Sequence, residues 1–448
     1  MHELLTTTAE RAIRYLEGLN ERGVASDPAV VTRLAELAIP LPADPSPADE
    51  TIALLDSYNA ATMAIAGPRF FGFVIGGALP AALAANWLAG AWDQNAALAE
   101  VTPLPAKLED VALDWLLDAL GLPPGTGAGF VTGATMANFT CLVAARHSVL
   151  KQAGWDVEAD GMFGAPAVTV VVGEEAHPTL FKSLGLAGFG RNRVVRVPVD
   201  KQGRMRANML PDLSGPTIVC LQAGNVNTGA FDPALEIVPK AKATNAWVHV
   251  DGAFGLWAAA SPSKAHLMAG YSDADSWATD AHKYLNTPYD SGLAFVRSPD
   301  VLRAAMAISA AYLPSSPRRD PANFTPELSR RARGIEVWAA LHTLGRSGLA
   351  DLVERTCRYA TRFAEGLRAA GYTILNEVVL NQVLVTFGDD EMTRRVIAGI
   401  QRDGTCWCGE TIWQGQTAMR ISVSSWATTD ADVERSLQAM IQVAHKLA

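Results

Sequence analysis

Short β-branched runs alternate with helical segments through the middle of this chain, and that alternation constrains its fold more than any other feature. The order of elements predicts strands at 167–172, 194–199, 217–222 and 246–250, and a helix at 233–244. The first of these runs shows no alternation of polar residues, which indicates a strand buried on both faces of a parallel sheet. We therefore expect a doubly wound α/β domain around a mostly parallel sheet.

Two charged residues lie at positions where ligands bind in such a fold. Asp251 directly follows the apolar strand at 246–250, and ligands of open α/β sheets gather at the carboxyl ends of strands. Lys283 lies in a turn before a further apolar run, 292–296, with His282 directly ahead of it. Burying an ammonium group is costly unless it is paired or chemically converted, so this lysine needs a partner or a reaction.

An acid and a lysine in this order fit the requirements of pyridoxal 5'-phosphate (PLP). Lys283 would form a Schiff base with the cofactor aldehyde. Asp251 would face the ring nitrogen and keep it protonated, so that the ring accepts the electron pair released at a substrate α-carbon. The sequence thus predicts a PLP enzyme in which both residues are catalytic and bind the cofactor.

The stretches His249-Val250-Asp251-Gly252-Ala253-Phe254 and Asp280-Ala281-His282-Lys283 resemble motifs of the group II PLP-dependent amino-acid decarboxylases, which include the aromatic amino-acid, glutamate and tyrosine enzymes. The resemblance runs over residues 68–430. It implies a fold type I structure, like that of aspartate aminotransferase, and a homodimer that decarboxylates an L-amino acid to the amine and CO2. It also places Asp280 and His282 at the cofactor.

The element expected to bind the cofactor phosphate is the start of a long helix, which the stretch 129–138 opens and which continues through His147. Small residues before a helix N-terminus let backbone N–H groups approach an anion, and the helix dipole favours it. Ala134 and Thr135 are therefore expected to be the donors. The resembled family has a glycine in place of Ala134 and a glutamate in place of Met136.

Further cofactor contacts are implied by the resemblance. His177 would stack on the cofactor ring and assist catalysis, with Thr179 beside it. The alternative is a histidine that caps the following helix, but its place after a strand favours the cofactor role. Val226 replaces a threonine that lies by the ring in the family, so that hydrogen bond is expected to be lost. Asn225 or Asn227 would then be the candidate to replace it.

Four residues are expected at the substrate. Phe70 and Phe71 belong to an aromatic stretch that resembles a segment lining the family's substrate site, although a core-packing turn explains them equally well. Trp92 belongs to a segment that reaches the site, often that of the neighbouring subunit. Arg420 would hold a substrate carboxylate with its planar fork, or else pair with an acid between domains. The aromatic residues favour an aromatic or other apolar substrate, while glutamate and aspartate stay open.

The segment from Leu313 to Pro326 bears on the choice between related activities. In aromatic decarboxylases a tyrosine on a mobile lid here protonates the carbanion left by CO2 loss, and this segment contains no tyrosine. In related enzymes without it, O2 reacts instead and an aldehyde forms, so decarboxylation with oxidative deamination is an alternative. Arg420 suggests an aminotransferase as a further alternative. The departures from the family pattern at Val226 and Met136 allow a PLP-binding protein without catalysis.

The length of the chain predicts several parts. With 448 residues it is too long for one compact core. Apolar residues at helical spacing predict a helical segment at 1–75. The alternating elements give a large PLP-binding α/β domain at 76–345, and the remainder, 346–448, reads as a small α+β domain.

The charge, the length of the apolar segments and the cysteine content argue against a nucleic-acid partner, a membrane partner and a metal site. The net charge is −9 without a basic run, so no nucleic-acid partner is expected. The apolar segment at 78–92 is shorter than a membrane span, so no membrane partner is expected either. Five scattered cysteines suit reduced thiols in a cytoplasmic enzyme. Cys406 and Cys408 lack further ligands nearby, so no metal site is predicted.

Overall fold

The computed structural model describes residues 1–308 and 318–447. The chain forms two compact units. The large unit comprises Ala78–Arg358 and Asn376–Gln382, and the small unit comprises Met1–Gly77, Tyr359–Leu375 and Val383–Ala448.

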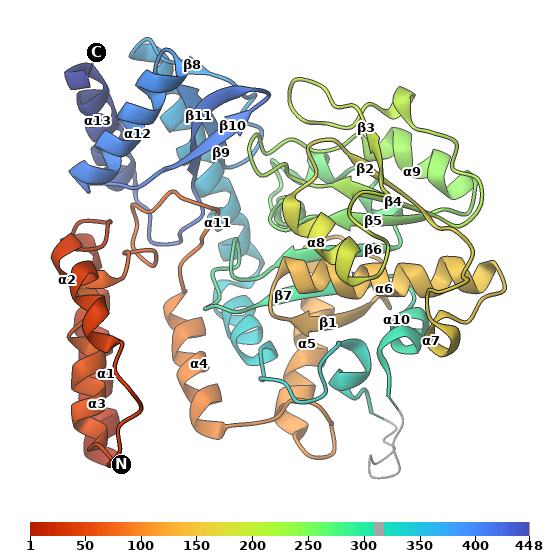
Figure 1. The fold of residues 1–448 in the computed structure, drawn as a ribbon, viewed down its shortest axis with the longest axis horizontal. Coiled ribbons are helices and arrows are strands. Elements are labelled where there is room, and N and C mark those ends of the chain that lie inside the picture. Colours follow the sequence, from red (N-terminus) through yellow and green to blue (C-terminus); the bar gives the residue numbers. More distant parts are fainter. Residues whose placement is uncertain (309–317, 448) are drawn as a thin grey trace. The chain divides into compact units, whose positions relative to one another are not determined.

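The large unit is built around a seven-stranded sheet in the order β1-β7-β6-β5-β4-β2-β3 (Figure 1). Its strands are β1 Gly127–Val131, β2 Thr169–Gly173, β3 Val195–Val197, β4 Thr217–Gln222, β5 Trp247–Asp251, β6 Ser276–Asp280 and β7 Gly292–Val296. Strands β2 to β6 pair in parallel, whereas β7 runs antiparallel to both β1 and β6. The predicted α/β class with a mostly parallel sheet is therefore confirmed.

Helices cover this sheet and connect its strands through loops at the strand ends. In chain order they are α4 Pro80–Trp92, α5 Pro103–Ala119, α6 Ala134–Gln152, α7 Val157–Asp160, α8 Pro178–Leu186, α9 Ala234–Ala243 and α10 Pro299–Met306. Helix α6 packs on β5, β6 and β7, and α8 and α10 pack beside it (Figure 1). Helix α11, Gly334–Ala369, is interrupted at Gly345, where the backbone leaves the helical region at φ 58°.

Apolar side chains from α6 and the strands form the core of the large unit. Leu142, Val172 and Ile218 are fully buried in one cluster with Ala278 of β6 and Ala294 of β7. Strands β4 to β7 are buried along their whole length. Accordingly β7 is apolar throughout and β4 is apolar from Ile218 to Leu221, as is typical of strands covered on both faces.

The small unit combines a four-stranded sheet with helices from both ends of the chain. Its sheet has the order β10-β11-β9-β8. The elements are β8 Thr373–Ile374, β9 Gln382–Thr386, β10 Gly409–Trp413 and β11 Gln416–Ser422, with α1 His2–Glu17, α2 Pro28–Arg33, α3 Ala48–Asp56, α12 Asp390–Asp403 and α13 Asp430–Leu447. Arg69 joins the two ends, because its guanidinium binds Asp432 at 3.0 Å and the Asn20 carbonyl at 2.9 Å.

The element boundaries differ from the predictions in a few places. Strand β1 was not expected, and it includes the first residues of the stretch 129–138 that was predicted to open the helix. Helix α6 begins at Ala134 and continues past His147 to Gln152. Helix α5, predicted at 106–120, begins at Pro103, since a proline is tolerated in the first helical turn, where its missing N–H has no partner to lose. None of the helices within residues 1–308 and 318–447 has the length and apolar character of a transmembrane span.

Candidate active site

One cavity of about 360 Å³ opens at the carboxyl ends of the parallel strands in the large unit. This volume lies within the usual range of small-molecule sites. Every residue predicted at the cofactor lines it: Ala134, Thr135, His177, Thr179, Val226, Asp251, Asp280, His282 and Lys283. Other lining residues are Thr132, Gly133, Met136, Gln222, Gly224, Ala253, Phe254 and Tyr289.

Lys283 is held by an acid that ends the neighbouring strand. Its Nζ lies 2.9 Å from Oδ2 of Asp280, the last residue of β6. The other oxygen of Asp280 accepts the Ala134 N–H at 2.5 Å and lies 3.4 Å from His282 Nε2. Burial lowers the pKa of His282, although the Asp280 carboxylate opposes this. Asp280 therefore joins the lysine to the first turn of α6.

The start of α6 is packed closely enough to present its backbone to the cavity. Gly292, the first residue of β7, has no side chain, and a Cβ there would lie 2.4 Å from Gly133 Cα. The backbones of β7 and of the turn before α6 therefore meet directly. The nineteen-residue helix that follows directs its positive dipole end and the N–H groups of its first turn toward the cavity, as an anion requires. Of these, the Ala134 N–H is bound to Asp280.

Asp251 ends β5 and is buried, with 5% of its surface exposed. Burial raises the pKa of its carboxyl, and the positive charges of His177 and Lys283 act in the opposite direction. A cationic group placed against this carboxylate would favour its charged form further.

His177 caps helix α8 and also lines the cavity, so a helix-capping role and a cofactor-binding role are compatible. Its Nδ1 accepts the Thr179 N–H at 3.3 Å and lies 2.7 Å from Thr179 Oγ1. Because a backbone N–H can only donate, Nδ1 is the acceptor, and the neutral ring carries its proton on Nε2. Thr179 therefore fixes the orientation of the imidazole.

The residues of this cavity fit PLP. An amine, a buried acid and a helix N-terminus converge on one space from three separate strand ends. PLP needs a lysine for its aldehyde, an acid for its ring nitrogen and an anion site for its phosphate.

The comparisons with known proteins agree with this geometry. Residues 56–387 match the family model described as "Pyridoxal-dependent decarboxylase conserved domain". The chain belongs to this family. The predictions of the family, of a PLP-dependent carboxy-lyase and of the cofactor are thereby confirmed.

Relatives in the pyridoxal-dependent decarboxylase family include enzymes with different products. Tryptophan decarboxylase 1 of Oryza sativa subsp. japonica is 28% identical over 402 residues, which cover 80% of this chain and 77% of the relative. The 4-hydroxyphenylacetaldehyde synthase of Rhodiola rosea is 28% identical over 60% of this chain and 57% of the relative. The solved structure of Oryza sativa TDC with PLP and tryptamine superposes with a TM-score of 0.92 at 23% identity, covering 99% of this chain and 97% of that one. The fold type I architecture is confirmed.

The residues predicted at the substrate of this decarboxylase lie elsewhere in the chain. Phe70 and Phe71 belong to the small unit and are buried, Phe70 stacked on Trp407 with ring centroids 5.1 Å apart. Arg420 lies on β11 of the same unit, and burial lowers the pKa of its guanidinium to about 10. Trp92 ends α4 in the large unit and is 42% exposed, outside the cavity lining. Their roles at the substrate stay predictions.

Two cavity residues carry chemistry that sequence reasoning missed. Tyr289 stacks on His282 with ring centroids 4.3 Å apart, and burial raises the pKa of its hydroxyl to about 12. It lies six residues after Lys283, so its proximity to the lysine was the available signal. Gln222 ends β4, directly opposite Asp251 in the parallel register, so the strand-end rule that found Asp251 would also have found it. The segment from Leu313 to Pro326 lies partly outside the described residues.

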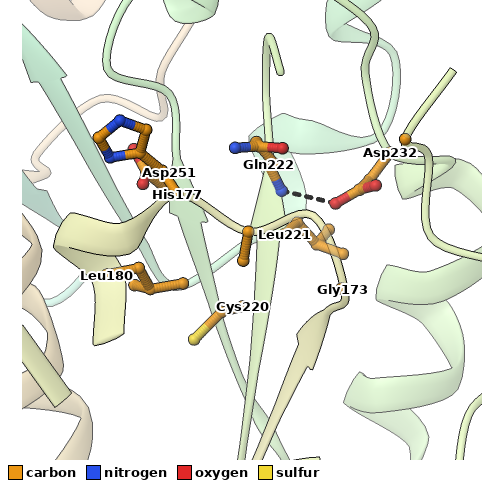
Figure 2. Close-up of a pocket in the computed structure, with 10 residues that line it drawn as sticks. Gly173, His177, Leu180, Cys220, Leu221, Gln222, Asp232 and Asp251 are labelled. Atoms are coloured by element: carbon orange, nitrogen blue, oxygen red, sulfur yellow. Dashed lines mark hydrogen bonds between the residues drawn. The ribbon is translucent and has the colours of Figure 1, made fainter. Parts of the chain in front are cut away.

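Asp232 lies behind the site and binds two backbone donors. One carboxylate oxygen accepts the Met205 N–H at 2.7 Å. The other accepts the Gln222 N–H at 2.7 Å, as Figure 2 shows. It lines a small cavity together with His177, Gln222 and Asp251. Burial raises the pKa of Asp232 to about 6, while the two hydrogen bonds act in the opposite direction.

This raised pKa predicts a pH-dependent stability. An aspartate in an unfolded chain titrates near pH 3.9, so between about pH 4 and pH 6 the folded protein holds a proton that the unfolded chain has released. The unfolding free energy should therefore fall as pH rises through this window. Relative to Asp232→Asn, which does not titrate, the wild type should lose about 1–3 kcal/mol. Urea unfolding at several pH values measures the difference. The exposed-site variant Asp212→Asn is the control, and a wild-type-minus-Asp232→Asn difference that does not change with pH would contradict the prediction.

Proposed function

We propose that this decarboxylase converts an L-amino acid with an aromatic or other apolar side chain to its amine and CO2, with Lys283 as the residue that binds the cofactor covalently. The observation that supports this most directly is the convergence of Lys283, Asp251 and His177 on one cavity at the start of α6. Bound PLP supplies an electron sink for the pair released when the bond from Cα to the carboxylate breaks.

The chain's own residues then have separate tasks. Lys283 would hold the cofactor through its Nζ, the amine that lies 2.9 Å from Asp280 Oδ2. Asp251 holds the proton on the ring nitrogen, because a buried carboxylate is stabilised by an opposite charge beside it. The first turn of α6 would hold the phosphate through the Thr135 N–H. The Ala134 N–H donates to Asp280 Oδ1 at 2.5 Å, and it would have to leave that carboxylate to join the phosphate site. His177, oriented by Thr179, braces one face of the ring.

The apolar part of the cavity supports the proposed substrate class. Met136, Val226, Phe254 and the ring of Tyr289 contribute to its lining. An apolar side chain buried against them is stabilised by about 25 cal/mol for each Å² removed from water. A substrate carboxylate side chain would need a cationic partner, and Lys283 is already committed to the cofactor.

The test is a screen of single L-amino acids with the PLP-loaded protein, in which CO2, amine and hydrogen peroxide are measured together. We expect CO2 and amine in equal amounts with an aromatic or apolar amino acid. Amino transfer that depends on an added keto acid, without CO2, would instead identify an aminotransferase and contradict the proposal.

The second candidate is decarboxylation with oxidative deamination to an aldehyde. It is favoured by the absence of tyrosine between Leu313 and Pro326 and by the similarity to an aldehyde synthase. Against it, Tyr289 is a half-exposed residue of the cavity lining, and its hydroxyl keeps its proton at neutral pH, which makes it a candidate acid for Cα. In the same screen, O2 consumption with aldehyde and peroxide would establish this activity.

A homodimer is part of the proposal. Trp87, Leu88 and Trp92 on α4 are 42%, 52% and 42% exposed. Large exposed apolar side chains grouped on one helix are typical of a surface that another protein covers. Light scattering coupled to size-exclusion chromatography should give twice the monomer mass, and the monomer mass of 47.6 kDa would contradict a dimer.

A further inference from the structure

Gln222 lies in the candidate site, and its side-chain amide donor is bound by no other described residue. Its side chain is 9% exposed and lines the main cavity beside Asp251. Figure 2 shows it among the side chains that line the smaller cavity behind, together with His177 and Asp232. Neither the mechanism above nor the predicted site uses it.

The orientation of the Gln222 amide follows from its neighbour. Asn225 Oδ1 accepts two backbone N–H groups, from Asn227 at 2.9 Å and Thr228 at 3.2 Å. This fixes Nδ2 as the other end of the Asn225 amide, because a backbone N–H requires an acceptor. Nδ2 then donates to Gln222 Oε1 at 3.0 Å. The Gln222 Nε2 group therefore points away from Asn225.

That Nε2 group has no hydrogen-bond partner among the described residues. The interactions of Gln222 in residues 1–308 and 318–447 are made by its backbone and by Oε1. Gln222 lines the main cavity, so this donor is accessible to a ligand bound there. A donor held in a fixed direction beside a cofactor cavity indicates a ligand oxygen that it would bind.

The order of the strands in the sheet indicates which oxygen of PLP the Gln222 Nε2 group would bind. In the sheet, β4 lies on one side of β5, and β6 and β7 lie on the other. The phosphate donors of α6 follow β1, next to β7, and Lys283 follows β6, so they lie on the side of Asp251 opposite Gln222. In PLP the phosphate arm and the ring hydroxyl flank the aldehyde carbon on opposite sides. With the phosphate toward α6, the hydroxyl oxygen faces β4.

We propose that Gln222 is a cofactor-binding residue whose Nε2 donates a hydrogen bond to the ring hydroxyl oxygen of PLP. Val226 lies in the loop after β4 and also lines the cavity. Its side chain is apolar and cannot donate a hydrogen bond to PLP. Asn225 is a positioning residue that fixes the amide direction. The inference rests on the proposed placement of PLP between Asp251 and Lys283.

The test measures cofactor binding and absorbance. Gln222→Met removes the amide at similar length, and Gln222→Glu replaces the donor by an oxygen. Both should raise the PLP dissociation constant about ten- to a hundredfold, as expected for a lost hydrogen bond to a charged group. Both should also move upward the pH midpoint of the visible band of the lysine-linked cofactor, because the donor stabilises the deprotonated oxygen. The shift should be larger for Gln222→Glu.

Asn225→Asp separates positioning from packing. It keeps Oδ1 for the two backbone donors but turns Nδ2 into an acceptor, so the Gln222 amide should rotate and the midpoint should rise as in Gln222→Met. Cys220→Ala, on the same strand and lining only the smaller cavity, should leave both values unchanged. If Gln222→Met fails to fold, Gln222→Glu carries the decision.

Unchanged dissociation constants and midpoints in the folded Gln222 variants would overturn the inference. A separate measurement checks the placement on which it rests. Borohydride reduction of the loaded wild type, followed by peptide mass analysis, should label Lys283. A label on a different lysine would overturn the proposed site itself, independently of the behaviour of Gln222.

Discussion

Replacing Lys283 by alanine should abolish the visible absorbance of lysine-linked PLP and reduce CO2 release roughly a thousandfold or more. The variant lacks the amine that lies 2.9 Å from Asp280 in the cavity. PLP should still bind, because Asp251 and the start of α6 remain, but it should dialyse away. Absorbance spectra before and after dialysis, with CO2 release on the best substrate, measure both effects.

The matched control for Lys283→Ala is Lys151→Ala, an exposed lysine in the last turn of α6. It should retain the absorbance and the activity of the wild type. A Lys283→Ala protein that keeps its visible band after dialysis and still releases CO2 at the wild-type rate would show that the cofactor is held elsewhere.

Glu109→Gln should lower the free energy of unfolding by about 3–5 kcal/mol. Glu109 Oε1 lies 2.6 Å from Arg330 Nη1, and the two side chains are 1% and 0% exposed. The same arginine donates to the carbonyls of Ala96 at 2.7 Å and Phe130 at 2.8 Å. Removing the carboxylate leaves a buried guanidinium without its counter-charge, with the Arg319 guanidinium also nearby at 3.6 Å. Urea unfolding of the apoprotein measures the loss.

An exposed ion pair provides the comparison for Glu109→Gln. Asp118 pairs with Arg346, and these side chains are 63% and 71% exposed. Water screens such a pair, so Asp118→Asn should change the unfolding free energy by no more than about 0.5 kcal/mol. Equal effects of the two variants would mean that the Arg330 charge is compensated in another way.

The parallel core was predictable because its strands carry an unambiguous pattern. The run at 217–222 is apolar, β-branched and bounded by Pro216 and Gly224, and its observed bounds are the predicted ones. Strand β1 was missed because Gly127-Ala128-Gly129 has low intrinsic strand propensity. It is a strand because it pairs antiparallel with β7, a contact between distant parts of the chain that no local pattern reveals.

The candidate site was predictable where chemistry and strand ends coincide. Asp251 and Lys283 were found because an acid after an apolar strand and a lysine in a turn between strands are unusual. Gln222 also ends a strand, but it was missed because the prediction looked for charged groups at strand ends and a neutral amide is not one. Gln222 is a candidate cofactor ligand because of the direction of its Nε2 donor. That direction depends on Asn225 and on the geometry of the loop after β4.

The antiparallel pairing of β1 with β7 has a kinetic consequence. Gly127 opposes Val296 across this ladder, so the chain must complete nearly the whole sheet before the start of α6 reaches its place beside Gly292. Contacts between residues so distant in sequence form slowly, because the loop entropy must be overcome first. The cofactor cavity should therefore arise late in refolding. PLP present from the start would leave the refolding rate unchanged and act only at the end, by binding the finished protein and withdrawing it from the unfolding equilibrium.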